Sequence, residues 1–152
     1  MWLDAALAYL HFMAIFGLFA TLMYEVILLK VGAANLDLEA LALTDRKFGI
    51  QAGIVLVTGV LRAFFGAKGP AFYMHNSAFH LKIGLFVLAA LISIAPTIAF
   101  LRWRKSRRAD PSWRVPEAEW QRAKKLVRLE MIIIAFIPLA AVIMSRGLAG
   151  GF

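Results

Sequence analysis

The stretch NSAFHLKIGLFVLAALISIAPTIAFL, residues 76–101, is almost entirely apolar, and the basic stretch RWRKSRR, residues 102–108, follows it directly. The apolar stretch exceeds the roughly 20 residues that a helix needs to cross about 30 Å of hydrocarbon. Inside a bilayer only helices and closed barrels satisfy their own backbone polar groups, so we expect a transmembrane helix here. Three further apolar stretches lie at about residues 3–29, 48–65 and 127–146. The sequence therefore predicts an all-α integral membrane four-helix bundle, built as a single domain over residues 1–152.

The composition points to the same class of protein. Hydrophobic residues make up 62% of the chain and the mean hydropathy is +0.76, whereas soluble domains are about 45–50% apolar. The chain has no cysteine, which excludes disulfides, iron–sulfur clusters and thiolate chemistry. The first apolar stretch is too long for a signal peptide and lacks a basic start, so we expect it to be retained as a helix.

The basic residues are concentrated near one loop. Ten of the 17 Lys and Arg residues lie in or beside the segment of about residues 102–126, the predicted loop between the last two helices. They are Arg102, Arg104, Lys105, Arg107, Arg108, Arg114, Arg122, Lys124, Lys125 and Arg128. Positively charged loops face the cytoplasm, so we expect this loop inside and both termini outside, in the inner (plasma) membrane of a bacterium. The expected partner of these charges is anionic lipid and not nucleic acid, because no fold with stacking aromatic residues accompanies them. Residues 35–47 are expected to form a short amphipathic helix before the second span.

Ionisable residues inside membrane segments are costly, and they are therefore candidates for function. Here they are His11, Glu25, Arg62, His80, Lys82, Glu130 and Arg146. At 1.5 Å per residue, His11 lies about 10 Å from the outer surface, and His80 lies about one turn in. Arg62 and Arg146 end their helices on the same side. Two imidazoles at similar depth beside three cations fit haem b: His11 and His80 would bind the iron, and Arg62, Lys82 and Arg146 would bind the propionates.

Helical spacing supports part of this site. Four residues spaced by seven form one stripe on the first helix, and this stripe should face the interior of the bundle; they are Asp4, His11, Leu18 and Glu25. Gln51, Thr58 and Arg62 share a face of the second helix.

The third helix leaves the second imidazole undecided. His80 and Lys82 lie about 200° apart around the axis, whereas His75 and Lys82 share a face. Either His75 or His80 therefore fits as the second iron ligand. We prefer His80, because His75 lies near the Gly-Pro loop at the surface.

The same residues fit other roles. Either helix histidine could bond to a neighbouring carbonyl, and the cations could extend to the interface. Glu25 is expected to pair with a basic residue near the inner face. Met74 and His75, together with Met13 and the helix histidines, offer copper the soft and imidazole ligands that it takes. A copper-handling or transport protein is therefore the alternative, and a cofactor-free structural membrane protein is the third.

Short segments form a pattern across the helices: His11-Phe12-Met13-Ala14 with Gly17 and Tyr24, Asp45-Arg46, Phe79-His80-Leu81-Lys82, and Arg128-Leu129-Glu130. This pattern resembles the HemJ-type protoporphyrinogen oxidases, small four-helix membrane proteins related to the CopD-like group, of which the chain would be a separate bacterial branch. The late Arg of that family's first helix has no counterpart, because Ile27 stands near its place and Glu25 lies close by.

The resemblance implies a haem b-binding membrane oxidoreductase that converts protoporphyrinogen to protoporphyrin and passes electrons to quinone. Lys82 and Arg62 would then be the catalytic residues, and His11 and His80 the iron ligands. Besides the lipid bilayer, the expected partners are a porphyrin and a quinone, and the sequence permits an oligomer.

Overall fold

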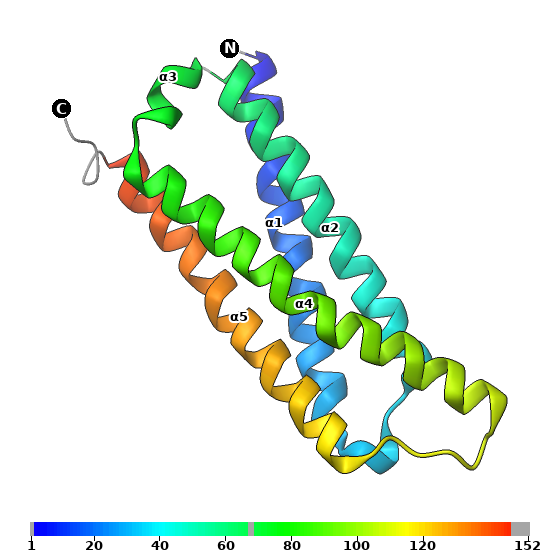
Figure 1. The fold of residues 1–152 in the computed structure, drawn as a ribbon. Coiled ribbons are helices and arrows are strands. Elements are labelled where there is room, and N and C mark those ends of the chain that lie inside the picture. The colour runs from blue at the N-terminus through cyan, green and yellow to red at the C-terminus, as the bar shows by residue number, and fades with distance from the viewer. Residues whose placement is uncertain (1, 67–68, 147–152) are drawn as a thin grey trace.

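The computed structural model describes residues 2–66 and 69–146, and within these residues the chain is all-α (Figure 1). The long helices are α1 (Trp2–Leu28), α2 (Leu38–Phe65), α4 (Ser77–Ala109) and α5 (Glu117–Ser145). The short helical segments are η1 (Leu29–Val31), η2 (Ala33–Asn35) and α3 (Gly69–Met74). All four long helices are long and apolar enough to cross a membrane. The predicted all-α membrane bundle is therefore confirmed.

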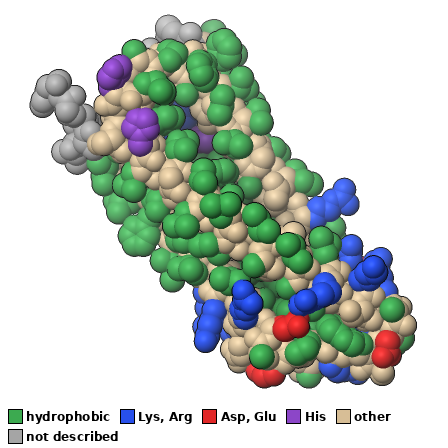
Figure 2. Space-filling model, in the orientation of Figure 1, with side chains coloured by type: hydrophobic (Ala, Val, Ile, Leu, Met, Phe, Trp, Pro, Cys, Tyr) green, Lys and Arg blue, Asp and Glu red, His purple; other side chains and the backbone are tan. Residues whose placement is uncertain are grey.

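The bundle consists of two helical hairpins (Figure 1). α1 packs mainly against α2, and α4 packs mainly against α5, with smaller contacts between the hairpins. α3 joins the hairpins at one end of the molecule, which we call the α3 end. η1, η2 and the loop of residues 110–116 lie at the opposite end. We call this the basic end, because the Lys and Arg side chains visible in Figure 2 gather there.

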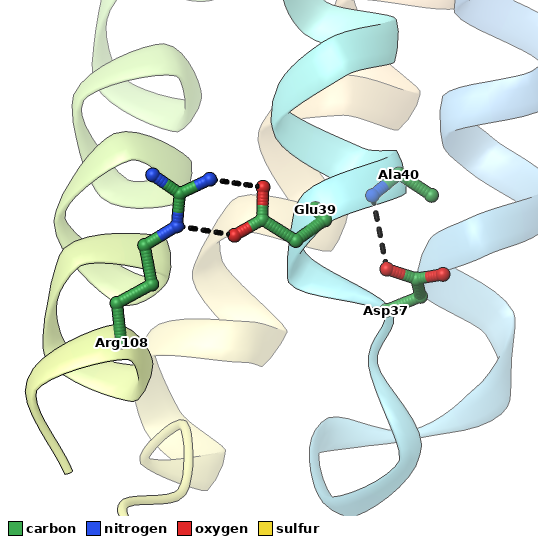
Figure 3. Close-up of polar contacts among 4 residues, drawn as sticks. All are labelled: Asp37, Glu39, Ala40 and Arg108. Carbon is green, nitrogen blue, oxygen red and sulfur yellow. Dashed lines mark hydrogen bonds and ion pairs between the residues drawn. The ribbon is translucent and has the colours of Figure 1, made fainter. Parts of the chain in front are cut away.

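Three helices extend further at the basic end than the apolar stretches indicated. α2 begins at Leu38 and runs without a break through most of the segment that was expected to form a short amphipathic helix leading into the second span. α4 continues to Ala109 and α5 begins at Glu117. The loop predicted over 102–126 is therefore confined to residues 110–116. Asp37 caps the start of α2, since its side chain accepts a hydrogen bond of 2.9 Å from the Ala40 amide (Figure 3).

Two tryptophans explain the extensions of α4 and α5. Trp103 on α4 is fully buried, and its Nε1 donates to Glu119 over 2.7 Å. Trp120 on α5 is also buried, and its Nε1 donates to the Leu29 carbonyl over 3.0 Å. The helix ends thus bury apolar side chains on one face and leave basic side chains exposed on the other, which is the pattern of an amphipathic helix outside the hydrocarbon.

Ion pairs between exposed side chains join the helices at this end. Both guanidinium edge nitrogens of Arg108 donate to the Glu39 carboxylate, which connects α4 to the start of α2 (Figure 3). Exposed pairs add little stability, so this pair mainly fixes the register of the two helices. In the loop, the Ser112 hydroxyl and amide donate to Asp110 over 2.6 and 2.9 Å, and they hold the pKa of Asp110 below its ordinary value.

The core lies toward the basic end, and the apolar outer surface extends to the α3 end. The largest fully buried apolar side chains are Leu22, Leu29, Leu41, Phe100, Trp103 and Val127. Many large apolar side chains are instead exposed along the four helices, and Figure 2 shows apolar side chains spread over the visible face above the basic end. Such a surface is suited to contact with lipid chains.

Candidate functional site

His11 is held between α1 and α2 in one tautomer. Its side chain is buried, and its Nδ1 lies 2.8 Å from the Thr58 hydroxyl. The same hydroxyl lies 2.7 Å from the Ile54 carbonyl, which can only accept. Because a hydroxyl has a single proton, Thr58 donates to Ile54 and accepts from His11. The ring proton of His11 is therefore on Nδ1, and Nε2 keeps its lone pair.

Two glycines allow α1 and α2 to approach closely around this histidine. A Cβ atom at Gly59 would lie 3.2 Å from Cε1 of His11. A Cβ atom at Gly17 would lie 2.8 Å from the side-chain Cδ of Gln51. His11 thus occupies the space that a side chain at position 59 would fill, and Gln51 occupies the space that a side chain at position 17 would fill.

Two cations lie near His11. Arg62 comes from α2 and Lys82 from α4, and both charges act on the His11 ring. The Arg62 guanidinium lies 5.7 Å from the centre of the Phe12 ring, and Lys82 Nζ lies 6.0 Å from that of Phe79. We call His11, Thr58, Arg62 and Lys82 the outer cluster.

The cations of the outer cluster have no carboxylate partner among the described residues. Within residues 2–66 and 69–146, no ion pair joins Arg62 or Lys82 to a carboxylate. The buried Nε of Arg62 has no acceptor in the same part of the chain. Both side chains are only partly exposed. Unpaired cations in apolar surroundings are costly, so the outer cluster is suited to an anionic group.

The other predicted residues are exposed, and both histidines bond to carbonyls outside this cluster. His80 is exposed, and its Nε2 donates to the Met74 carbonyl over 2.9 Å. His75 is exposed too, and its Nδ1 donates to the Ala71 carbonyl over 2.9 Å. Arg146 is exposed where α5 ends. The structure therefore brings together three of the predicted residues, and the pairing of His11 with His80 stays a prediction. Among the described residues, no group of three or more His, Cys, Asp or Glu side chains is arranged to hold a metal ion.

A second group of polar residues was not predicted as a site. Glu25, Asp45 and Glu130 are all buried, and they come from α1, α2 and α5. Thr97 on α4 donates to Asp45 over 2.8 Å. We call the three carboxylic residues the acidic cluster. Glu25 was expected to pair with a basic residue, but no ion pair involves it within the described ranges, and Asp45 and Glu130 lie close enough for their charges to act on it.

The sequence did contain a signal for Glu130. Its neighbours on α5 at helical spacing are Ala123, Val127 and Ile134, and all three are buried. A carboxylic residue within such an apolar stripe must face the interior of the bundle.

Comparison with known proteins gives a family but no relative of known activity. No curated protein and no solved structure matches the chain. The model of one family, described as a predicted membrane protein (DUF2214), matches residues 3–149. The match supports a membrane protein and provides no link to the HemJ-type or CopD-like families. Because it covers nearly all of the four-helix bundle, the chain belongs to the DUF2214 family of membrane proteins.

Proposed function

We propose that this membrane protein binds haem b at the outer cluster and acts in membrane redox chemistry. One observation carries the proposal: a buried imidazole, whose Nδ1 contacts the Thr58 hydroxyl, lies beside two cations that have no carboxylate partner among the described residues. Haem presents a complementary set of groups, because its iron takes imidazole nitrogen and its two propionates pair with cations.

The chemistry of the residues fits this group. His11 Nε2 would bind the iron, and Thr58 would hold the ring, as a hydrogen-bonded outer partner usually does for a ligating histidine. Arg62 and Lys82 would hold the propionates. When bound, haem would supply one-electron chemistry that no side chain provides. As a second ligand, His75 would bind through Nε2, because its Nδ1 donates to the Ala71 carbonyl. His80 would bind through Nδ1, unless its Nε2 first released the Met74 carbonyl.

The test is the absorption spectrum of protein that has been expressed with added haem and purified in detergent. We expect a reducible b-type spectrum that is lost in His11→Ala and kept in His75→Ala, which replaces an exposed histidine. A well-folded wild-type protein that stays colourless would refute the proposal. A spectrum that is kept in His11→Ala but lost in His80→Ala would show that the exposed His80, and not His11, binds the iron.

The resemblance to HemJ-type oxidases extends the proposal to an enzymatic activity, and the charge distribution extends it to an orientation in the membrane. Protoporphyrinogen would be the substrate, a quinone the electron acceptor, and Lys82 and Arg62 the catalytic residues. The concentration of Lys and Arg at the basic end (Figure 2) supports an orientation with this end in the cytoplasm of a bacterium. The outer cluster and both termini would then lie toward the outside of the inner membrane.

A further inference from the structure

A pocket opens between α2, α4 and α5, in the half of the bundle nearer the basic end. Its volume is about 190 Å³. The apolar part of its wall includes Leu18, Phe48 and Phe86, and its polar part includes Asp45 and Glu130. A cavity of this size and partly polar lining has room for several water molecules. The pocket therefore gives the acidic cluster access to water or solutes.

Glu130 lines this pocket. Its exposed fraction is 2%, and its Oε1 has no hydrogen-bond partner among the described residues. Glu25 has the same exposed fraction, and its Oε2 also has no partner within the described part of the chain. Asp45 is 7% exposed, and Thr97 satisfies one of its oxygens. Two of the three carboxyl groups thus leave a buried oxygen without a partner.

Among the residues that the structure describes, no cation pairs with the acidic cluster. Within residues 2–66 and 69–146, no ion pair involves Glu25, Asp45 or Glu130. Arg46 is the charged residue of the pocket wall besides the carboxyl groups, and its side chain is exposed. Isolated buried carboxylates are strongly destabilised, and three of them within reach of one another would also repel. The surroundings therefore favour carboxyl groups that carry protons.

We propose that the acidic cluster is a proton-binding site inside the membrane, with Glu130 as the group that exchanges its proton through the pocket. In uptake a carboxylate of the cluster takes a proton from a hydronium ion in the pocket and becomes a neutral acid, the hydronium ion becomes water, and release is the reverse. Nothing is oxidised or reduced. Glu25 does not line the pocket, so its proton exchanges through Asp45 and Glu130. The site is separate from the outer cluster: Leu18, which is buried, lies between Glu25 and His11 along the inward stripe of α1.

The first test is infrared spectroscopy of the full chain in lipid vesicles. We expect a carbonyl band of protonated carboxyl groups at neutral pH, which shifts in D₂O and loses intensity in Glu130→Gln, Glu25→Gln and Asp45→Asn. Glutamine and asparagine have nearly the shape of the neutral acids, so these variants should fold. Glu117→Gln makes the same change at an exposed position of α5 and should leave the band unchanged. Absence of the band from the wild type, or a band of wild-type intensity in all three cluster variants, would overturn the proposal.

A second measurement needs no variant. A hydrophobic carbodiimide reacts with a protonated carboxyl group in an apolar site: the acid proton moves to a nitrogen of the reagent, and the carboxyl oxygen bonds to its central carbon. We expect mass spectrometry to locate the adduct at Glu130, with a yield that falls as the pH rises. Adducts at surface acids alone would contradict the site. Neither measurement depends on haem. The proton-binding proposal and the haem proposal are therefore tested independently, and either can fail while the other stands.

Discussion

Thr58 accepts the Nδ1 proton of His11 over 2.8 Å, and this single contact decides which nitrogen of the buried imidazole is free. The hydroxyl proton is already donated to the Ile54 carbonyl on the same helix. The contact joins α1 to α2 and sets both the position and the tautomer of the ring. A histidine prepared in this way is ready to act as a ligand or as a hydrogen-bond acceptor through Nε2.

Thr58→Val keeps the shape of the side chain and removes the acceptor. We expect it to lower the free energy of unfolding by about 1–3 kcal/mol, because a buried N–H loses its partner. If His11 binds haem, the affinity should also fall about 10–100-fold, as it does when an outer partner of a metal ligand is lost. Haem titration and thermal unfolding of the purified protein measure the two effects.

Thr21→Val is the matched control, since the Thr21 hydroxyl donates only to carbonyls of its own helix, at Gly17 and Leu18. It should leave the haem affinity unchanged. Thr58→Ser restores an acceptor and should recover most of the loss. Equal effects of Thr21→Val and Thr58→Val on haem affinity would show that the His11 contact has no special role.

Gly59→Ala tests the close approach of the helices. The added Cβ would lie 3.2 Å from His11 Cε1, so either the ring or the helix must shift. Gly49→Ala is the control on the same helix, because nothing lies within 4 Å of its added Cβ. Alanine is the better helix former by about 1 kcal/mol, so Gly49→Ala should be neutral or stabilising. Crowding of this kind costs about 1–3 kcal/mol, so Gly59→Ala should be less stable than Gly49→Ala. Equal stability of the two variants would mean that the ring has free space.

The orientation in the membrane can be tested with two single cysteines in a chain that has none of its own. Ala71 on α3 and Ala109 at the end of α4 are both exposed and lie at opposite ends of the bundle. We expect a membrane-impermeant maleimide to label Ala71→Cys from outside the cell, and Ala109→Cys only after the membrane is opened. The reverse pattern would invert the proposed orientation. Labelling of both from one side would contradict a four-span protein.

The hydropathy of the sequence was enough to predict the four spanning helices, because lipid leaves few alternatives for apolar stretches of this length. It was not enough to find where helices end outside the hydrocarbon. Around Trp103 and Trp120 the sequence is rich in Lys and Arg and was interpreted as a loop. The two indoles carry the contrary signal, since they continue the apolar stripes of α4 and α5 at helical spacing.

Within the site, positions on one helix were easier to predict than pairs of residues from different helices. The seven-residue spacing put His11 and Glu25 on one inward face, and both are buried. Spacing also showed that His80 and Lys82 point in different directions, but not which of them faces the bundle. That depends on how the two hairpins pack, and the sequence of a single helix does not contain this information. The convergence of Glu25 with Glu130 depends on the same packing.

Lys82→Met deletes a charge and keeps the apolar stem, so it separates anion binding from packing. If Lys82 holds a haem propionate, losing a charged hydrogen-bond partner should weaken haem binding by about tenfold or more. Arg146→Met makes a comparable change at the exposed end of α5 and should leave haem affinity unchanged. An equal loss of affinity in Arg146→Met would indicate that Arg146 also binds a propionate.

Activity needs a separate measurement: growth of a bacterial strain that lacks protoporphyrinogen oxidase. We expect the wild type to restore growth and Lys82→Met to fail, although both accumulate in the membrane. A well-expressed, haem-loaded wild type that does not restore growth would exclude the oxidase activity and leave a haem protein with another redox role, with Ile27 in place of the late arginine as the first position to exchange.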